Sequence, residues 1–226
     1  MPPLRLSIII PVVDEAPTLG ACVANARSVA DEVIVSDGGS SDGSPELARE
    51  AGARVVNGSA GRGAQLNRGA AAADCDVLLF LHADTVLPKD SRVQIEGALA
   101  AGFDGGGSKI RFDAAGALLR FGAGWINRRT ALTKLPLGDQ AQFITRTAFE
   151  SLGGFRDWPI LEDLDLMRRL KRSYHVAILD GPVVTSPRRF VKNGMLRTIA
   201  VNWLIWGLYL LGASPQRLAA LYRRHR

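Results

Sequence analysis

Acidic residues follow two strongly apolar segments of the chain, where a ligand could reach them. Asp37 opens the sequence DGGSSDG after EVIVS, and Asp84 ends His82-Ala83-Asp84 after VLLFL. A carboxylate at the end of a buried strand must be hydrated, hydrogen-bonded or bound to a cation, because burying it alone is costly. Mg²⁺ commonly takes one or two protein carboxylates and completes its shell with phosphates and water. We therefore expect Asp84 to bind a divalent cation that neutralises a diphosphate. We expect Asp37 to accept hydrogen bonds from a base or ribose.

A further acidic group, Glu162-Asp163 with Asp165, precedes a helical pattern that ends in basic residues. Acids in the first turn of a helix complement its dipole, so capping alone could explain them. A catalytic interpretation needs one of them to face a cleft and take a proton from a hydroxyl group. Similar alternatives stay open for His82, a structural residue or a ligand, and for DGGSSDG, which could be a surface turn.

The elements that must position these residues alternate along the first hundred residues. Short apolar runs predict strands, and the segments between them have helical patterns. Strands this apolar are typical of a parallel sheet with helices on both faces, and ligands bind such sheets beyond the carboxyl ends of the strands. The expected strands are residues 6–13, 32–36, 54–57 and 77–81, and the expected helices are residues 18–29, 45–51, 65–72 and 91–100.

The middle of the chain is less regular, and no linker divides it. We expect one domain over residues 1–190, followed by a helical tail over 191–226 that is not a separate domain. The sequence predicts strands within 103–111 and at 142–145, 176–179 and 183–186, and helices at 117–128 and 162–171.

The C-terminal tail is basic and apolar. The net charge is +6, and no acidic residue follows Asp180. The basic residues after Asp180 are Arg188, Arg189, Lys192, Arg197, Arg217, Arg223, Arg224 and Arg226. Within the tail, residues 198–212 are apolar apart from Thr198 and Asn202, and contain Trp203, Trp206 and Tyr209. Aromatic residues of this kind suit a membrane interface, and the run is shorter than the roughly 20 residues that a spanning helix needs. We expect a helix lying on an anionic membrane surface; a C-terminal core helix and a nucleic-acid contact are the alternatives.

The cysteine content and the N-terminal sequence indicate in which cellular compartment the protein is expected. Cys22 and Cys75 form no disulfide framework and no metal-ligand spacing, so we expect both to be reduced and buried. The first residues lack the pattern of a signal peptide. These features favour a cytoplasmic protein, at the inner face of the cell membrane if the tail binds there.

Five segments taken in order resemble the family 2 glycosyltransferases of the GT-A fold. The resemblance covers about residues 5–185, and it is closest to a compact bacterial branch with an LHADT-type metal motif and an ending similar to GASPQRLAALY at 212–222. The five segments are IIIPVVDE at 8–15, EVIVSDGGSSDG at 32–43, GRGAQLNRGA at 61–70, LFLHADT at 79–85 and GGF-x4-ILEDLDLMRRL at 153–170.

The resemblance implies a GT-A-like, Rossmann-like open sheet and a metal-dependent, inverting transfer of one sugar from a nucleoside diphosphate, with UDP favoured, to a hydroxyl acceptor that a lipid could carry. The cofactor would be Mg²⁺ or Mn²⁺ at Asp84. Asp163 matches the catalytic base, with Glu162 beside it. The resemblance places the nucleotide at Pro11, Glu15, Asp37, Arg62 and Asp84, and the acceptor near Gln140.

Two departures from the family pattern weaken parts of this assignment. His82 replaces the first carboxylate of the metal motif, and DGGS replaces the commoner DDGS beside the nucleotide. Two rivals remain. A nucleotidyltransferase would carry a glycine-rich basic loop after the first strand, where this chain has PVVDEAPTLG. A non-catalytic protein that binds membranes or nucleic acid would leave the LHADT and Glu162-Asp163 segments unexplained; no nucleic-acid partner is expected.

Overall fold

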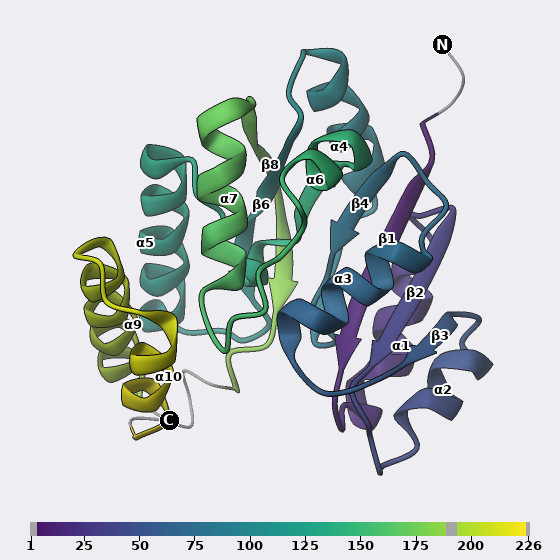
Figure 1. Cartoon of the computed structure of the whole chain (residues 1–226), viewed down its shortest axis with the longest axis horizontal. Helices are drawn as coiled ribbons and strands as arrows, with labels where there is room; N and C mark the ends of the chain where they lie inside the picture. The colour runs from purple at the N-terminus through teal and green to yellow at the C-terminus, as the bar shows by residue number, and fades with distance from the viewer. Residues whose placement is uncertain (1–3, 189–193, 225–226) are drawn as a thin grey trace.

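The fold is a single twisted sheet with helices on both faces (Figure 1). A computed structural model describes residues 4–188 and 194–224. The strands lie in the order β3-β2-β1-β4-β7-β6-β8-β5. They span β1 Leu6–Val12, β2 Glu32–Asp37, β3 Arg54–Asn57, β4 Val77–Phe80, β5 Thr85–Val86, β6 Gly105–Phe112, β7 Gln142–Thr145 and β8 Val176–Thr185.

The helices connect these strands and close the chain at its C-terminal end. They are α1 Ala16–Arg27, α2 Ser44–Glu50, α3 Arg62–Ala72, α4 Ser91–Ala100, α5 Ala117–Thr133, the 3₁₀ turn η1 Gly138–Gln140, α6 Arg146–Ser151, α7 Glu162–Ser173, α9 Met195–Leu210 and α10 Pro215–Arg224.

Strand β1 shows why the sheet is covered on both faces. Ile8 and Ile10 pack into one core with α1, whereas Ile9 between them packs into a second core with α3, α6 and α7. Side chains of a strand alternate between faces, so a run that is apolar at every position buries both of them. The predicted mostly parallel, helix-covered sheet is confirmed: β1 pairs in parallel with β2 and β4, and β2 in parallel with β3.

The second half of the sheet differs in part from the prediction. Strand β7 runs antiparallel to both β4 and β6, while β8 runs parallel to β6. The two short strands predicted at 176–179 and 183–186 are one strand, β8. Asp180-Gly181-Pro182 suggests a turn, but a register irregularity opposite Ser108 and Ile110 absorbs these residues without breaking the strand. Strand β5 and helix α6 were not predicted.

The C-terminal helices lie at the edge of the molecule beside α5 (Figure 1). Helix α9 covers most of the predicted apolar run, and Gly212, with φ of 94°, lies between α9 and α10. In the part of the chain that the structure describes, no helix is both long and apolar enough to span a bilayer. The division at residue 190 stays a prediction, and Arg189 and Lys192 lie outside the described residues.

Candidate functional site

The predicted site residues come from loops at one edge of the sheet. Strands β1, β2 and β4 are parallel and adjacent, so their carboxyl ends open toward the same side. Glu15 follows β1, Asp37 ends β2, and His82 and Asp84 follow β4. Pro11 lies within β1 opposite Ser36 of β2, close to the same edge.

Hydrogen bonds join the loops that follow β1 and β2. The Asp37 carboxylate accepts bonds from the backbone N–H of Gly39 at 2.8 Å and from the N–H and hydroxyl of Ser40. Asp14, in the left-handed region at φ 52°, accepts a bond from the N–H of Ser41 at 2.8 Å. Asp37 is thus nearly buried and holds its own loop in shape. The prediction that it also contacts the nucleotide stays a prediction.

Two acids that the sequence assigns to the donor side converge on one cation. Nη2 of Arg188 lies 3.2 Å from Oδ2 of Asp84 and 3.3 Å from Oε2 of Glu15. Arg188 comes from the segment after β8, and its two partners raise its pKa further above the ordinary value. Sequence reasoning counted Arg188 as part of the basic tail and did not assign it to the site. The two carboxylates of Asp84 and Glu15 are thus close enough together to bind one positively charged group between them.

A second group of charged residues links α3, the loop after β4 and α7. Nε of Arg62, at the first position of α3, lies 2.9 Å from Oε1 of Glu162 at the start of α7. The same guanidinium contacts Nε2 of His82. Arg62 was predicted near the nucleotide; in the structure it joins His82, two residues before Asp84, to the Glu162-Asp163 pair.

Asp163 is held by the backbone at the start of α7. Its Oδ2 accepts a bond from the N–H of Gly138 at 2.7 Å, and its Oδ1 accepts one from the N–H of Leu164 at 2.7 Å. A side chain at position 138 would crowd both groups, because a Cβ would lie 2.5 Å from Nη2 of Arg62 and 3.0 Å from Oδ2 of Asp163. Leu161, at φ 65°, turns the chain into the helix. The acid that the sequence assigns as base is therefore positioned on both oxygens.

Asp139 and Arg129 are members of this group that sequence reasoning missed. Oδ1 of Asp139 is buried without a hydrogen-bond partner, and burial raises the pKa of this carboxyl above its ordinary value. Burial lowers the pKa of Arg129, against the attraction of Asp139 and Asp163. The sequence signal was the acid in Gly138-Asp139-Gln140, directly before a strand.

Glu162 is a further buried acid of this group and lies beside Asp163. Burial, followed by the neighbouring Asp163, raises the pKa of Glu162 to about 7, and Arg62 acts in the opposite direction. A carboxyl group whose pKa lies near neutrality can gain or lose a proton under ordinary conditions, and such groups concentrate at functional sites. Helix capping alone does not account for Glu162, since its side chain is buried against Arg62.

The Gln140 side chain, predicted on the acceptor side, is enclosed in the structure, and its role toward an acceptor stays a prediction. Gln140 is fully buried. Its Oε1 accepts bonds from Thr130 at 2.8 Å and Arg129 at 3.0 Å, and its Nε2 donates to the carbonyl of Ser108 at 2.9 Å. A satisfied, buried amide joins α5 to β6 and is closed to a ligand. Asp139, the preceding residue, carries the unpartnered polar atom instead.

The site offers few protein side chains that could bind a metal ion. Among the described residues, no cluster of three or more His, Cys, Asp or Glu side chains could hold a metal ion. Cys22 and Cys75 are buried thiols, and burial raises the pKa of Cys22 to about 12. Asp84 with Glu15 is the pair that converges on a cation, so phosphate oxygens and water would have to complete a metal's shell.

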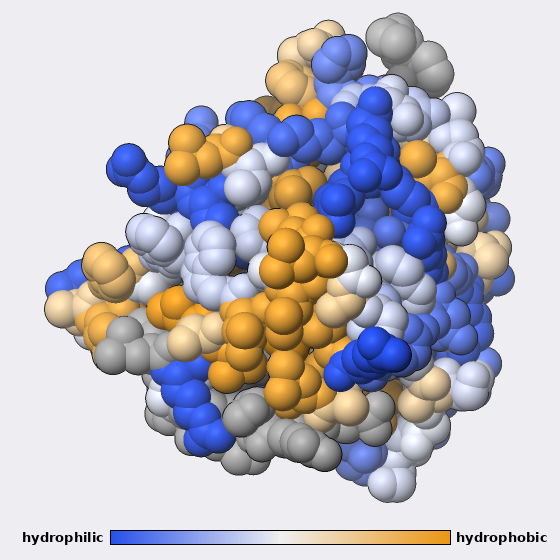
Figure 2. All heavy atoms as spheres, turned by 60° about the vertical axis from the view of Figure 1, so that its left-hand side comes forward, coloured by the Kyte–Doolittle hydropathy of each residue, from blue (hydrophilic) through white to orange (hydrophobic). Residues whose placement is uncertain are grey.

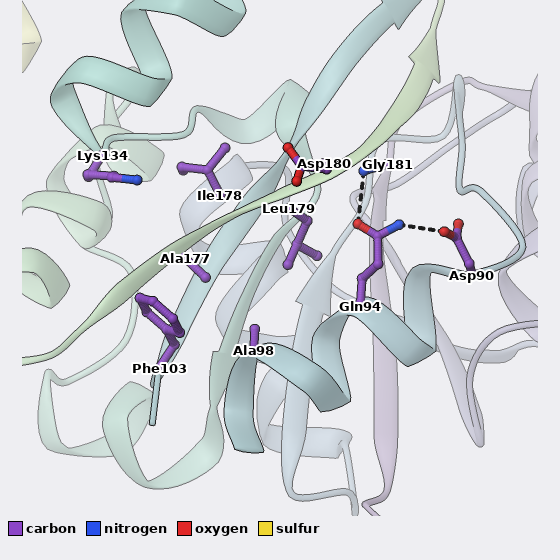
Figure 3. Close-up of a pocket in the computed structure, with 10 residues that line it drawn as sticks. All are labelled: Asp90, Gln94, Ala98, Phe103, Lys134, Ala177, Ile178, Leu179, Asp180 and Gly181. Carbon is purple, nitrogen blue, oxygen red and sulfur yellow. Dashed lines mark hydrogen bonds between the residues drawn. The ribbon is translucent and has the colours of Figure 1, made fainter. Parts of the chain in front are cut away.

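A hollow beside β8 lies apart from these groups. It is lined by Gln94 and Ala98 of α4, Phe103, Lys134 and the first half of β8 (Figure 3). Gln94 accepts a bond from the N–H of Gly181 and donates one to Asp90 across its rim. None of the predicted site residues lines it, so the hollow is separate from the candidate site.

Sequence comparison finds a likeness in the N-terminal part of the chain. Residues 7–104 match the model of glycosyl transferase family 2. A TPR repeat-containing protein from Synechococcus elongatus is 36% identical over 101 residues, which are 42% of this chain. The chain covers 24% of the length of that curated relative.

Solved structures share the fold at low sequence identity. Glucosyl-3-phosphoglycerate synthase from Mycobacterium tuberculosis, in complex with Mn²⁺, UDP-glucose and phosphoglyceric acid, superposes with a TM-score of 0.63 at 22% identity, over 80% of this chain and 72% of that one. Mannosyl-3-phosphoglycerate synthase from Rubrobacter xylanophilus gives 0.61 at 19%, over 81% and 67%. TarS from S. aureus gives 0.64 at 17%, over 88% and 65%.

The matched segment contains Glu15, Asp37, Arg62 and Asp84. Residues 7–104 thus match glycosyl transferase family 2, and the chain shares the GT-A fold of these solved structures.

Proposed function

We propose that this protein transfers one sugar from a nucleoside diphosphate, UDP by preference, to an acceptor hydroxyl with inversion at the anomeric carbon. The observation that carries the proposal is the convergence of Glu15 and Asp84 on one cation at the edge where β1 and β4 end. The family 2 match includes both residues. Glucosyl-3-phosphoglycerate synthase, which shares the fold, was solved with Mn²⁺ and UDP-glucose.

A divalent cation, Mg²⁺ or Mn²⁺, fits the residues present. Asp84 would be its protein ligand, with Glu15 close by and the diphosphate oxygens completing the shell. When bound, such an ion stabilises negative charge on the departing diphosphate as a Lewis acid. Arg188 occupies the same place, so it must give up at least one of its two carboxylates when the cation binds.

Asp163 would act as the general base. It takes the proton from the acceptor hydroxyl while that oxygen forms a bond to the anomeric carbon, and the bond from this carbon to the diphosphate oxygen breaks on the opposite face. The backbone N–H groups of Gly138 and Leu164 hold the carboxylate at 2.7 Å each, so it does not have to be ordered during the reaction.

Arg62 would connect the residues that bind the cation with those that hold the general base. It contacts His82, next to the cation position, and Glu162, next to the base. Its positive charge partly offsets the acids around it, while Glu162 and Asp139 have raised pKa values. Positioning residues of this kind align two substrates in one cleft, which supplies much of the acceleration in transfer reactions.

Calorimetric titration with UDP, GDP and sugar nucleotides, each with and without Mn²⁺ or Mg²⁺, tests the donor site. We expect metal-dependent binding of a uridine nucleotide that Asp84→Asn weakens about tenfold or more, the scale of one charged contact. Asp180→Asn removes an exposed acid beside the hollow at β8 and is the matched control. A folded protein that binds none of these nucleotides would overturn the proposal.

The base is tested separately, by turnover. Asp163→Asn keeps the size of the side chain but cannot take a proton at neutral pH, so sugar transfer should fall by about a hundredfold or more while UDP binding is retained. Turnover close to that of the wild type would exclude Asp163 as the base. A nucleotidyltransferase on a similar sheet would instead release pyrophosphate from a nucleoside triphosphate, which the same assay can measure.

A further inference from the structure

Exposed apolar side chains form one surface over α5 and α9, which we call the α5/α9 face. On α5 they recur at helical spacing, so they share one side of the helix. On α9 and the residue that follows it they repeat in the same way. The face consists of Leu118, Phe121, Trp125 and Leu132 from α5 and Trp203, Leu204, Leu210 and Leu211 from the end of the chain. Sequence reasoning had assigned membrane contact to the C-terminal run alone.

The two sets of side chains meet in space. The rings of Trp125 and Trp203 lie 6.2 Å apart between centroids, and Trp203 also packs against Trp206 at 5.6 Å. The opposite sides of the helices face inward, where Ala123 of α5 and Ile205 of α9 are buried. Figure 2, which turns this side of the molecule toward the viewer, shows a continuous hydrophobic area bordered by hydrophilic residues. Phe121 and Leu211 are 64% and 86% exposed, so nothing in the described chain covers them.

The helices that carry the face, and α10 beside them, are charged with one sign only. Helices α5, α9 and α10 contain no acidic residue. Exposed arginines border the apolar side chains at both helices: Arg120 and Arg128 on α5, Arg197 on α9 and Arg217 on α10. A surface that combines exposed tryptophan, phenylalanine and leucine with arginine alone complements a partner that is apolar and negatively charged.

We propose that the α5/α9 face docks on an anionic lipid surface, with both helices lying in the plane of the interface. Tryptophan is favoured at that depth, and arginines at the border reach the headgroups. A second copy of this chain fits less well, because a symmetric dimer would bring together arginines of two copies with no acidic residue on these helices to pair with them. Neither helix needs to cross the bilayer for this role.

Docking here would place the candidate site beside the lipid. Trp206 of α9 lies under the guanidinium of Arg129, 5.3 Å from its ring centroid, and Arg129 bonds Gln140, the neighbour of Asp139. The helix that touches lipid thus packs directly on Arg129, whose charge attracts Asp139 and Asp163. This consequence rests on the proposed function: the acceptor hydroxyl would belong to a lipid or a lipid-linked molecule presented at the membrane surface.

Flotation of the full chain with vesicles tests the docking. We expect binding to vesicles that contain phosphatidylglycerol, weaker binding to phosphatidylcholine alone, and loss of binding at high salt. The double variant Phe121→Ser with Leu211→Ser should bind at least about tenfold more weakly, because it loses two apolar side chains that the lipid surface would bury. Val93→Ser removes an apolar residue of similar exposure on α4, away from the face, and should change nothing.

Each other occupant gives a distinct result. Light scattering that shows a dimer which the double variant dissociates, without vesicle binding by the wild type, would assign the face to a second copy. Retention on duplex DNA in place of vesicles would assign the arginines to nucleic acid. Either result, or no vesicle binding, overturns the proposal. UDP binding measured on the same samples keeps this failure separate from a failure of the proposed donor site.

Discussion

The backbone N–H of Gly138 donates a hydrogen bond to Oδ2 of Asp163 at 2.7 Å, and the space around Gly138 has no room for a Cβ. The bond joins η1 to the first turn of α7, two elements 25 residues apart in sequence. The carboxylate proposed as base therefore depends on a glycine for its orientation.

Gly138→Ala should impair transfer while leaving the fold intact. The added methyl would lie 2.5 Å from Arg62, whose side-chain end can move, and 3.0 Å from Asp163. Displacing either group by a few tenths of an ångström to 1 Å misaligns the base, so kcat should fall by roughly 10- to 100-fold with little change in donor KM.

Gly97→Ala is the matched control for that substitution, because a Cβ at Gly97 in α4 meets nothing within 4 Å. Steady-state kinetics and thermal unfolding of both variants decide the matter. An alanine at 138 with wild-type kcat would show that the contact does not position the base.

Arg188 should compete with a divalent cation for Asp84 and Glu15. Removing it in Arg188→Ala leaves two carboxylates without their counter-ion, so Mn²⁺ alone should bind more tightly, roughly two- to fivefold, the scale of an exposed ion pair. Electron paramagnetic resonance of free Mn²⁺, titrated without nucleotide, measures this directly.

The control for Arg188 is Arg49→Ala, which removes a similarly exposed arginine paired with Glu46 on α2. Its Mn²⁺ affinity should equal that of the wild type. If Arg188→Ala binds Mn²⁺ equally or less well, the guanidinium and the metal do not share a position.

The sequence predicted the positions of some candidate site residues better than those of others. Asp37 and Asp84 could be placed because parallel strands bring their carboxyl ends to one edge, a rule that needs only the order of the elements. Arg188 could not be placed, since it reaches Asp84 from 104 residues away, along a strand that the sequence divides in two. Nothing local distinguishes it from the other arginines of the tail.

Gln140 and Asp139 show a limit of another kind. They are adjacent in one 3₁₀ turn, and the turn directs the amide into the bonds with Thr130 and Ser108 while the carboxyl remains without a partner on Oδ1. Which of two neighbouring polar residues faces a ligand depends on the packing of α5 and β6 around them. Resemblance to a family locates the segment but not which of its side chains is enclosed in the structure.

Glu162 should make the stability of the protein depend on pH. Its pKa in the folded chain is raised to about 7. Between its ordinary value and about pH 7 the folded state therefore holds a proton that the unfolded chain releases. The unfolded state binds fewer protons in this window, so the free energy of unfolding falls as the pH rises through it and levels off above about 7.

Glu162→Gln removes this dependence, because an amide does not titrate. Urea unfolding at pH 5 and pH 8 should give a difference between the two pH values that is smaller in the variant by an amount on the order of 1 to 3 kcal/mol. Glu150→Gln, at an exposed glutamate of α6, should keep the wild-type difference. An unchanged difference in Glu162→Gln would mean that this carboxyl does not hold its proton near neutral pH, and Arg62 would then face two ionised acids at the start of α7.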